Sequence, residues 1–129
     1  MGKPVKQPII FEELTYQIIG IAIEIHKTLG NIHKESVYQK ALEHEFKEKN
    51  ISFDREKRIP VTYNGSQVGI YVPDFVVDNK VVIEMKATPL LPSHAYTQLS
   101  YYLKTSGYRV GLLINFGTPT LQVKRSIYG

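Results

Sequence analysis

The stretch YVPDFVVDNKVVIEMKA, from Tyr71 to Ala87, decides the fold of this chain. It holds two strand-like runs of valine, isoleucine and phenylalanine, joined by a short turn around Asn79. The same runs carry Asp74, Glu84 and Lys86 at positions where a buried sheet favours hydrocarbon. Charged side chains inside a buried hairpin need a reason, so a functional site is sought here first.

The length of the turn sets which charged residues face each other. Side chains alternate across a strand, so Glu84 and Lys86 share one face. A three-residue turn, Asp78-Asn79-Lys80, places Asp74 opposite Glu84 on this face, whereas a two-residue turn places Asp74 opposite Ile83. We predict the three-residue turn. Two carboxylates about 5 Å apart repel by roughly 3 kcal/mol at an effective dielectric near 20, so something must offset the repulsion.

A bound divalent cation would offset this repulsion better than Lys86 alone. Mg²⁺ takes oxygen ligands, commonly one or two carboxylates with waters and substrate phosphates, and the backbone carbonyl of Met85 is a further candidate ligand. Such an ion polarises a phosphodiester oxygen and makes a bound water more acidic. Lys86 would then position or deprotonate that water, or stabilise charge on the phosphorane.

Each of these charged residues also has a plainer explanation. A Glu-x-Lys pair in a strand is commonly a solvated face with a weak cross-strand ion pair, and an aspartate after Pro73 can simply begin a turn. The functional interpretation is favoured because the charges gather in one hairpin and because Glu35, on a predicted helix, also faces inward.

Composition limits the classes of protein to consider. With 129 residues, 43% of them hydrophobic, we expect residues 1–10 to form a flexible arm and residues 11–129 to form a single domain. The absence of cysteine excludes disulfides, thiolate zinc sites and cysteine nucleophiles. No apolar run approaches the roughly 20 residues of a membrane span, so we expect a soluble cytoplasmic protein. The formal net charge of +4 mildly favours an anionic partner.

The remaining sequence predicts helices around a sheet. Apolar residues at helical spacing predict one helix from Phe11 to a stop at Gly30 and a second from Lys34 to Lys49. Asn64-Gly65 lies between segments rich in valine, isoleucine and tyrosine, which predicts a hairpin. A third helix is expected from His94 to Thr105.

Two strands complete the pattern. RVGLLINF at residues 109–116 is typical of a fully buried strand, and TLQVKRSIY of an alternating edge strand. The strand at 80–87, the third helix and the strand at 109–116 form a β-α-β unit, which favours a parallel crossover. The expected order is therefore two helices, three or four strands, a helix and two strands, with a mixed central sheet.

A carboxylate on a helix, then Pro-Asp in one strand and Glu-x-Lys in the next, followed by a helix and a strand, resembles the PD-(D/E)XK nuclease superfamily. The chain is similar to one branch, the small proteins named for a GxxExxY motif, over nearly its whole length, from about Leu14 to Arg125. The similar segments are LGNIHKESVYQKAL, YVPDFVVDNKVVIEMKA, QLSYYLKTSGYRVGLLINFG and LQVKR. The resemblance implies a restriction-endonuclease-like α/β core with a mixed central β-sheet flanked by helices, in the order α-α-β-β-β-α-β-β.

The resemblance also implies roles for six residues. In that superfamily an aspartate and a glutamate bind Mg²⁺, for which Mn²⁺ can substitute, while a lysine lies near the nucleophile and a helical glutamate often assists. The matching residues here are Asp74, Glu84, Lys86 and Glu35. Gln98 and Tyr102 match the Q-x-x-x-Y of the exonuclease branch and, being four residues apart, share one helix face. One departure is Ile32, which stands where the GxxExxY motif has glycine.

The function expected from this resemblance is Mg²⁺-dependent hydrolysis of phosphodiester bonds in DNA, with RNA as the second choice. One alternative is a nucleic-acid-binding accessory module that is inactive without a partner such as a helicase. Another is a structural protein in which Lys86 neutralises the carboxylates permanently. A two-fold homodimer would let a small nuclease reach both strands. Five residues are candidates for phosphate contacts, or else ordinary surface groups: His94, Lys104, Arg109, Lys124 and Arg125.

Overall fold

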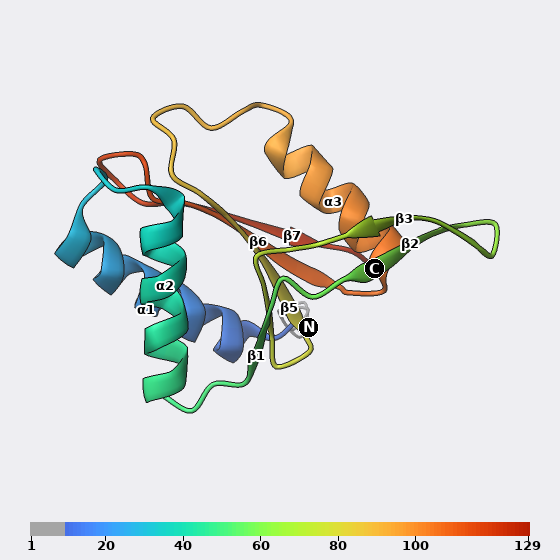
Figure 1. The fold of residues 1–129 in the computed structure, drawn as a ribbon, viewed down its shortest axis with the longest axis horizontal. Helices are drawn as coiled ribbons and strands as arrows, with labels where there is room; N and C mark the ends of the chain where they lie inside the picture. Colours follow the sequence, from blue (N-terminus) through green and yellow to red (C-terminus); the bar gives the residue numbers. More distant parts are fainter. Residues whose placement is uncertain (1–9) are drawn as a thin grey trace, which may run out of the picture.

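The computed structural model describes residues 10–129, so the arm predicted at residues 1–10 lies, apart from Ile10, outside the described residues. Within them the order is two helices, five strands, a third helix and two further strands. The predicted fold class is confirmed, because a five-stranded mixed sheet lies between helices on both of its faces (Figure 1).

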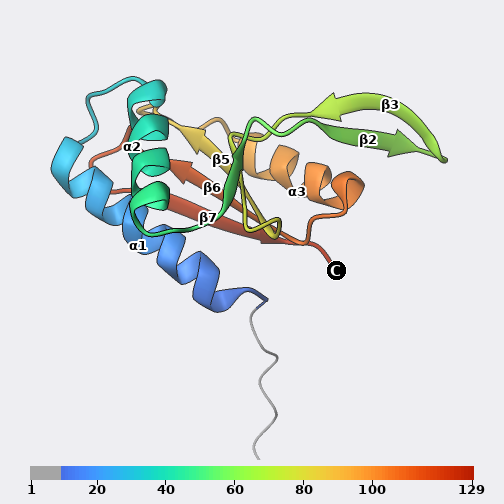
Figure 2. The ribbon, with the colours of Figure 1, turned by 60° about the horizontal axis from the view of Figure 1, so that its bottom comes forward.

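The first two helices match their predictions closely. α1 spans Glu12–Leu29 and ends at Gly30, whose φ of 71° is a backbone conformation that glycine adopts without strain. α2 spans Glu35–Glu48 and buries Tyr38, Leu42 and Phe46, which recur one turn apart along one face. Both helices cover the same face of the sheet (Figure 2).

The main sheet has the strand order β1-β4-β5-β6-β7. Its strands are β1 (Phe53–Arg55), β4 (Phe75–Val77), β5 (Val81–Lys86), β6 (Val110–Asn115) and β7 (Gln122–Ile127). β5 and β6 are parallel, and α3 (Ala95–Ser106) crosses between them, which confirms the predicted β-α-β unit. β6 is buried throughout and β7 is an edge strand, both as predicted.

The two remaining strands form a sheet of their own. β2 (Ile59–Tyr63) and β3 (Ser66–Tyr71) pair around Asn64 and Gly65, whose φ angles of 49° and 81° confirm the predicted hairpin. This hairpin extends beyond the main sheet on the side of α3 (Figure 2). Pro73 follows β3 and carries no backbone N–H, so it cannot extend a hydrogen-bonded strand toward β4.

The predicted element order therefore needs a correction. The order α-α-β-β-β-α-β-β has three strands between the second and third helices, whereas the described residues have five. β1 contains only three residues, too few for an alternating pattern to be recognised. The β2–β3 hairpin adds the other difference, since it leaves the main sheet instead of continuing a meander.

Each face of the main sheet has its own hydrophobic core. Val81, Ile83 and Met85 of β5 pack on the side of α1 and α2. Val82 lies on the opposite face with residues of α3 and of the hairpin, including Leu99 and Tyr71. Because side chains alternate along a strand, Glu84 and Lys86 share the face of Val82. The charged end of β5 is thus directed toward α3 and the hairpin.

Candidate active site

The turn between β4 and β5 has the predicted length. Val77 pairs with Val81, which leaves Asp78, Asn79 and Lys80 in the turn, and Phe75 pairs with Ile83. Asp78 and Asn79 have φ angles of 51° and 52°, in the left-handed region that these two residue types tolerate well. Continuing the register by one residue places Asp74 opposite Glu84, so the three-residue turn is confirmed.

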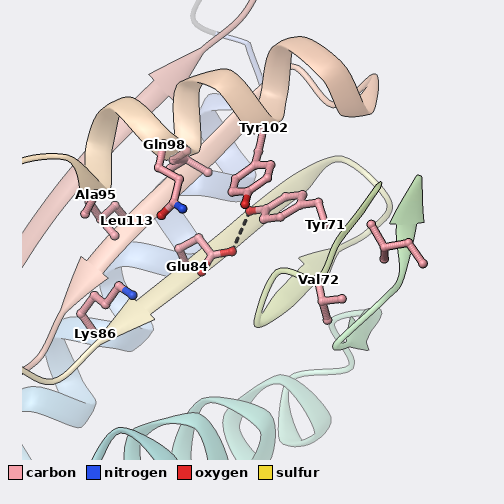
Figure 3. Close-up of a pocket in the computed structure, with 10 residues that line it drawn as sticks. Tyr71, Val72, Glu84, Lys86, Ala95, Gln98, Tyr102 and Leu113 are labelled. Atoms are coloured by element: carbon pink, nitrogen blue, oxygen red, sulfur yellow. Dashed lines mark hydrogen bonds between the residues drawn. The ribbon is translucent and has the colours of Figure 1, made fainter. Parts of the chain in front are cut away.

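Glu84 and Lys86 line a pocket of about 200 Å³ between the sheet, α3 and the hairpin (Figure 3). Gln98 and Tyr102 enter the same pocket from α3. Four of the six predicted catalytic side chains therefore meet in one cavity, although they come from two segments separated by the whole β5–α3 connection. The other lining residues are Ile70, Tyr71, Val72, Ala95, Leu99 and Leu113.

The Glu84 carboxylate is the most strongly perturbed acid in this pocket. Burial, together with the nearby charge of Asp74, raises the pKa of Glu84 to about 7, although a hydrogen bond from Tyr71 opposes the shift. That bond runs from the Tyr71 hydroxyl to Glu84 Oε1 over 2.7 Å. The half-buried carboxylate thus lies where its negative charge is disfavoured unless a cation is near.

Tyr71 was not expected at this site from the sequence. It lies at the end of β3 with a relative exposure of 4%, and its ring stacks on Tyr102 with centroids 3.9 Å apart and planes at 7°. Burial and the adjacent Glu84 raise the pKa of its hydroxyl, so the hydroxyl stays protonated and donates a hydrogen bond to Glu84. The available signal was a tyrosine three residues before Asp74, which reads equally well as an ordinary strand residue.

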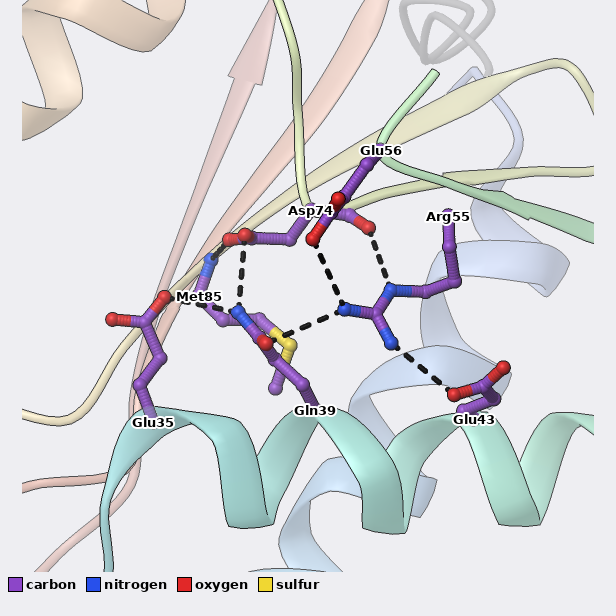
Figure 4. Close-up of polar contacts among 7 residues, drawn as sticks. All are labelled: Glu35, Gln39, Glu43, Arg55, Glu56, Asp74 and Met85. Carbon is purple, nitrogen blue, oxygen red and sulfur yellow. Dashed lines mark hydrogen bonds and ion pairs between the residues drawn. The ribbon is translucent and has the colours of Figure 1, made fainter.

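Asp74 occupies the bend directly before β4, the strand that lies between β1 and β5 in the main sheet (Figure 4). Its Oδ2 accepts a hydrogen bond of 2.6 Å from the backbone N–H of Met85, and its Oδ1 accepts one of 3.1 Å from Gln39. Burial raises the pKa of Asp74, whereas the Met85 N–H and the charge of Lys86 act in the opposite direction. The carboxylate therefore accepts the Met85 N–H hydrogen bond in place of a strand carbonyl, at the position just before β4 begins.

The backbone carbonyl of Met85 points toward Asp74. The carbonyl of Lys86 accepts a hydrogen bond from Phe116 on the β6 side. Since successive residues of a strand direct their backbone groups to alternate sides, the N–H and carbonyl of Met85 both face the side of Asp74. Met85 carbonyl oxygen is thus available beside the Asp74 carboxylate.

Glu35, in the first turn of α2, lies on the same side of the sheet end as Asp74 and is linked to it through Gln39. Gln39, one turn later, donates through Nε2 to both Glu35 Oε1 and Asp74 Oδ1, each over 3.1 Å. Burial and then the charge of Asp74 raise the pKa of Glu35. The sequence correctly directs Glu35 inward, but it gives no sign that Gln39 links the two acids.

Arg55 of β1 completes this network on the far side of Asp74. Its Nε donates to the Asp74 carbonyl over 3.1 Å, and its terminal nitrogens bond to Glu43 and Gln39 of α2 (Figure 4). The guanidinium also lies over the Phe75 ring, 4.6 Å from its centroid. Arg55 thereby fixes the bend that carries Asp74 against α2.

Lys86 lies among the acids without being held by any of them. Its charge opposes the rise that burial causes in the pKa values of Glu35, Asp74 and Glu84. Among residues 10–129, however, no carboxylate oxygen comes within 4.0 Å of its ammonium group. Three carboxylates thus feel the charge of Lys86, which forms no ion pair with any of them among the described residues.

Ile32 occupies a loop position that does not require glycine. Its φ angle is negative, and its side chain is 83% exposed. The loop is closed instead by Tyr38, whose hydroxyl donates to the Gly30 carbonyl over 2.6 Å and accepts from the His33 N–H over 3.2 Å. The departure from the glycine of the motif therefore leaves the start of α2, and with it Glu35, in place.

The five candidate phosphate contacts lie at different places. His94 is exposed at the start of α3, one turn before Gln98, and Lys104 is exposed near the end of that helix. Lys124 lies in the same row of the sheet as Glu84, through Leu113, with its ammonium 5.7 Å from the Tyr96 ring centroid.

Two of the candidates face away from the pocket. Arg125 bonds to the Thr15 hydroxyl and the Ile10 carbonyl, so its side chain lies on the α1 face of β7. Arg109 precedes β6 and donates to the Gly129 carbonyl, at the end of the sheet opposite Lys86. The reason is geometric, since neighbouring residues of a strand face opposite sides and the two ends of a β6-length strand lie far apart.

The acidic side chains around Lys86 are of the type that binds a hard divalent cation. Asp74, Glu84 and Glu35 bring three carboxylates against one lysine, and burial raises the pKa of each acid, so an added cation would relieve an excess of buried negative charge. Across residues 10–129, no three acidic or histidine side chains are already drawn together closely enough to enclose an ion. The fit is one of donor type and charge.

Comparisons with known proteins bear on this arrangement. No helix within residues 10–129 is long and apolar enough to cross a membrane. No match to the chain was found among curated proteins or among solved structures. The family model of the PD-(D/E)XK nuclease superfamily, in contrast, matches residues 12–126, which include every residue of the pocket and of the Asp74 network. The chain therefore belongs to the PD-(D/E)XK nuclease superfamily.

Proposed function

We propose that this protein is a Mg²⁺-dependent nuclease that hydrolyses phosphodiester bonds of DNA, in preference to RNA, and that it falls in the GxxExxY branch of the superfamily. The observation that carries the proposal is Lys86, whose ammonium group lines a pocket with Glu84, forms no ion pair within residues 10–129, and acts on three carboxylates whose pKa values are all raised. A bound cation would balance the carboxylates, and Lys86 could then pair with a phosphate group of the substrate.

Asp74 and Glu84 would hold the ion, with the Met85 carbonyl as a third ligand and Glu35 as a direct or water-mediated one. When bound, Mg²⁺ supplies positive charge to the phosphate oxygens and makes a coordinated water more acidic. The Asp74 carboxylate is already oriented by Met85 and Gln39, so little conformational freedom is lost when it binds.

Lys86 would act on the reacting atoms. Its ammonium can donate a proton from Nζ toward the oxygen that gains negative charge at phosphorus, or hold the attacking water in line. Gln98 lines the same pocket from α3 with an amide that can both donate and accept, and would orient the substrate. Tyr102 borders the pocket through its ring, stacked on Tyr71.

The same contacts weigh against a purely structural role. A lysine that neutralises the carboxylates permanently should form close ion pairs with them, and within the described residues Lys86 forms none inside 4.0 Å. The alternative of a nucleic-acid-binding accessory module that needs a partner protein, such as a helicase, keeps the same site and differs in turnover. A cytoplasmic location and a homodimer stay predictions.

The decisive experiment is a cleavage assay with single-stranded, duplex and branched DNA, and with matched RNA, in Mg²⁺, in Mn²⁺ and in EDTA. We expect metal-dependent cleavage that falls at least about 100-fold in both Glu84→Gln and Lys86→Met. Asp78→Asn and Lys80→Met, at the turn end of the same hairpin, are matched controls and should cleave like the wild type. Unchanged cleavage in both site variants would remove the assignment.

The accessory alternative makes a different forecast for the same samples. It expects nucleic-acid binding that weakens steeply with salt, with no turnover by the isolated wild type in either metal. Binding without cleavage, followed by cleavage on addition of a helicase, would replace the present proposal with that alternative.

A further inference from the structure

We propose that Tyr71 is a positioning residue that orients the Glu84 carboxylate for the divalent cation, and that Tyr102 acts through Tyr71. This inference rests on the proposed function and adds to it a residue that the family pattern of helical Glu, Pro-Asp, Glu-x-Lys and Q-x-x-x-Y does not contain.

A hydrogen bond joins the two side chains. The Tyr71 hydroxyl donates to Glu84 Oε1 over 2.7 Å, and within residues 10–129 no other group donates to that carboxylate. A glutamate has three side-chain torsions, and a single fixed donor on one oxygen selects the rotamer and turns the second oxygen elsewhere (Figure 3). Tyr71 thus decides which oxygen of Glu84 is free for another partner.

Tyr71 itself is held in place by burial and by stacking. Its relative exposure is 4%, and its ring lies parallel to that of Tyr102, with planes at 7° and centroids 3.9 Å apart. Stacked rings of this kind add to the burial energy and fix the ring plane. Tyr102 therefore holds the donor in place, which gives the helical tyrosine of the Q-x-x-x-Y pattern a task that needs no contact with substrate.

Tyr71 and Glu84 belong to different sheets. It is the last residue of β3, in the two-stranded sheet, whereas Glu84 belongs to β5 of the main sheet. The hydrogen bond and the ring stack therefore join three separate elements, β3, β5 and α3, at the pocket. A donor supplied from a separate hairpin is a device for holding a ligand, because nothing in the pairing of the main sheet requires it.

Tyr71→Phe tests this directly, because phenylalanine keeps the stacked ring and removes only the donor. We expect Mn²⁺ affinity, measured by titration without nucleic acid, to fall about 10- to 100-fold. At limiting Mn²⁺, kcat should fall by a similar factor while KM for the nucleic acid changes by less than about twofold. Excess Mn²⁺ should restore the rate, which a merely structural defect would not allow.

Two further variants frame the result. Tyr108→Phe is the matched control, because the Tyr108 hydroxyl donates to Asn79 over 2.9 Å in the β4–β5 turn, away from Glu84. We expect this variant to have wild-type Mn²⁺ affinity. Tyr102→Leu keeps the Tyr71 hydroxyl but removes the stack, so it should weaken Mn²⁺ binding in the same direction. It also replaces Tyr71→Phe as the test if that variant does not fold.

The possible outcomes separate this inference from the proposed function. A wild type that binds Mn²⁺ and cleaves, with a folded Tyr71→Phe that binds Mn²⁺ equally well, overturns the inference and leaves the function standing. A wild type that neither binds Mn²⁺ nor cleaves overturns the function, and this inference with it.

Discussion

Asp74 and Glu84 occupy opposite positions in one antiparallel hairpin, yet their carboxylates are held by different parts of the fold. Asp74 is bound by the Met85 N–H and by Gln39 of α2, while Glu84 is bound by Tyr71 from the separate β2–β3 sheet. The charge of Asp74 nevertheless raises the pKa of Glu84. The two acids are thus close enough to interact but are positioned independently.

The first prediction concerns pH and the stability of the metal-free protein. Burial raises the pKa of Glu84 from 4.5 to about 7, so the folded state keeps this proton to a higher pH than the unfolded chain. The stabilisation of the folded state by the protonated Glu84 carboxyl is therefore complete below pH 4.5 and is lost as the pH rises through about 7. This loss lowers the free energy of unfolding by at most about 3 kcal/mol.

Glu84→Gln removes this titration. We expect its urea midpoint to exceed that of the metal-free wild type at pH 8, with the difference shrinking toward pH 5. Glu45→Gln is a suitable control, because a hydrogen bond from Lys49 lowers the pKa of Glu45 instead. A wild-type advantage at pH 8 would show that the Glu84 carboxylate is stabilised by groups other than those described above.

The second prediction concerns added divalent ions. Ions that bind only the folded state stabilise it by mass action, by about 2.7 kcal/mol at 100 times the Kd. We expect Mg²⁺ and Mn²⁺ to raise the melting temperature, and to do so more at pH 8 than at pH 6, because the ion needs deprotonated carboxylates and burial raises the pKa of all three acids.

Thermal denaturation with and without EDTA measures this effect. Glu84→Gln should lose most of the metal-induced shift, whereas Asp78→Asn, on the exposed turn of the same hairpin, should keep it. Equal shifts in both variants would mean that the ions bind somewhere else on the protein.

The third prediction concerns Gln39, which holds Glu35 and Asp74 together through one amide nitrogen. Gln39→Leu leaves two partly buried acids without this donor, so we expect the unfolding free energy to fall by about 1–3 kcal/mol. Metal affinity should fall about 10-fold, because the two carboxylates are no longer held in a fixed relation.

Urea denaturation and Mn²⁺ titration of the same preparation separate these effects. Lys40→Leu, the next residue on α2 and an exposed one, serves as the control for adding leucine to this helix. Loss of stability with unchanged Mn²⁺ affinity would restrict Gln39 to a structural role.

The sequence predicts the main features of this site because they depend on local rules. Alternation places Glu84 and Lys86 on one face, and a turn of three residues sets Asp74 opposite Glu84. Tyr71, Gln39 and Arg55 escape prediction because each acts across elements that are distant in the chain. No local pattern shows that the end of one hairpin touches a strand of another sheet, and β1, which carries Arg55, is too short to be periodic.

The last prediction separates two neighbouring basic residues of β7. Lys124 lies on the α3 face, in the row of Glu84, whereas the Arg125 side chain lies on the α1 face and bonds to Thr15 and Ile10. Lys124→Ala should therefore weaken nucleic-acid binding and lower the slope of log affinity against log salt by about one, with little effect on stability. Arg125→Ala should instead lower stability, by about 1–3 kcal/mol, since it unpairs buried polar groups and removes packing beneath α1.

Binding titrations at several salt concentrations, paired with urea denaturation, distinguish the two variants. Lys40→Ala, at an exposed lysine of α2 outside the set of candidate phosphate contacts, controls for the loss of one positive charge alone. Should Arg125→Ala change the salt slope while Lys124→Ala does not, nucleic acid would have to reach the α1 face of the sheet. The pocket that holds Glu84 and Lys86 opens on the other face, so that result would also separate binding from the proposed catalytic centre.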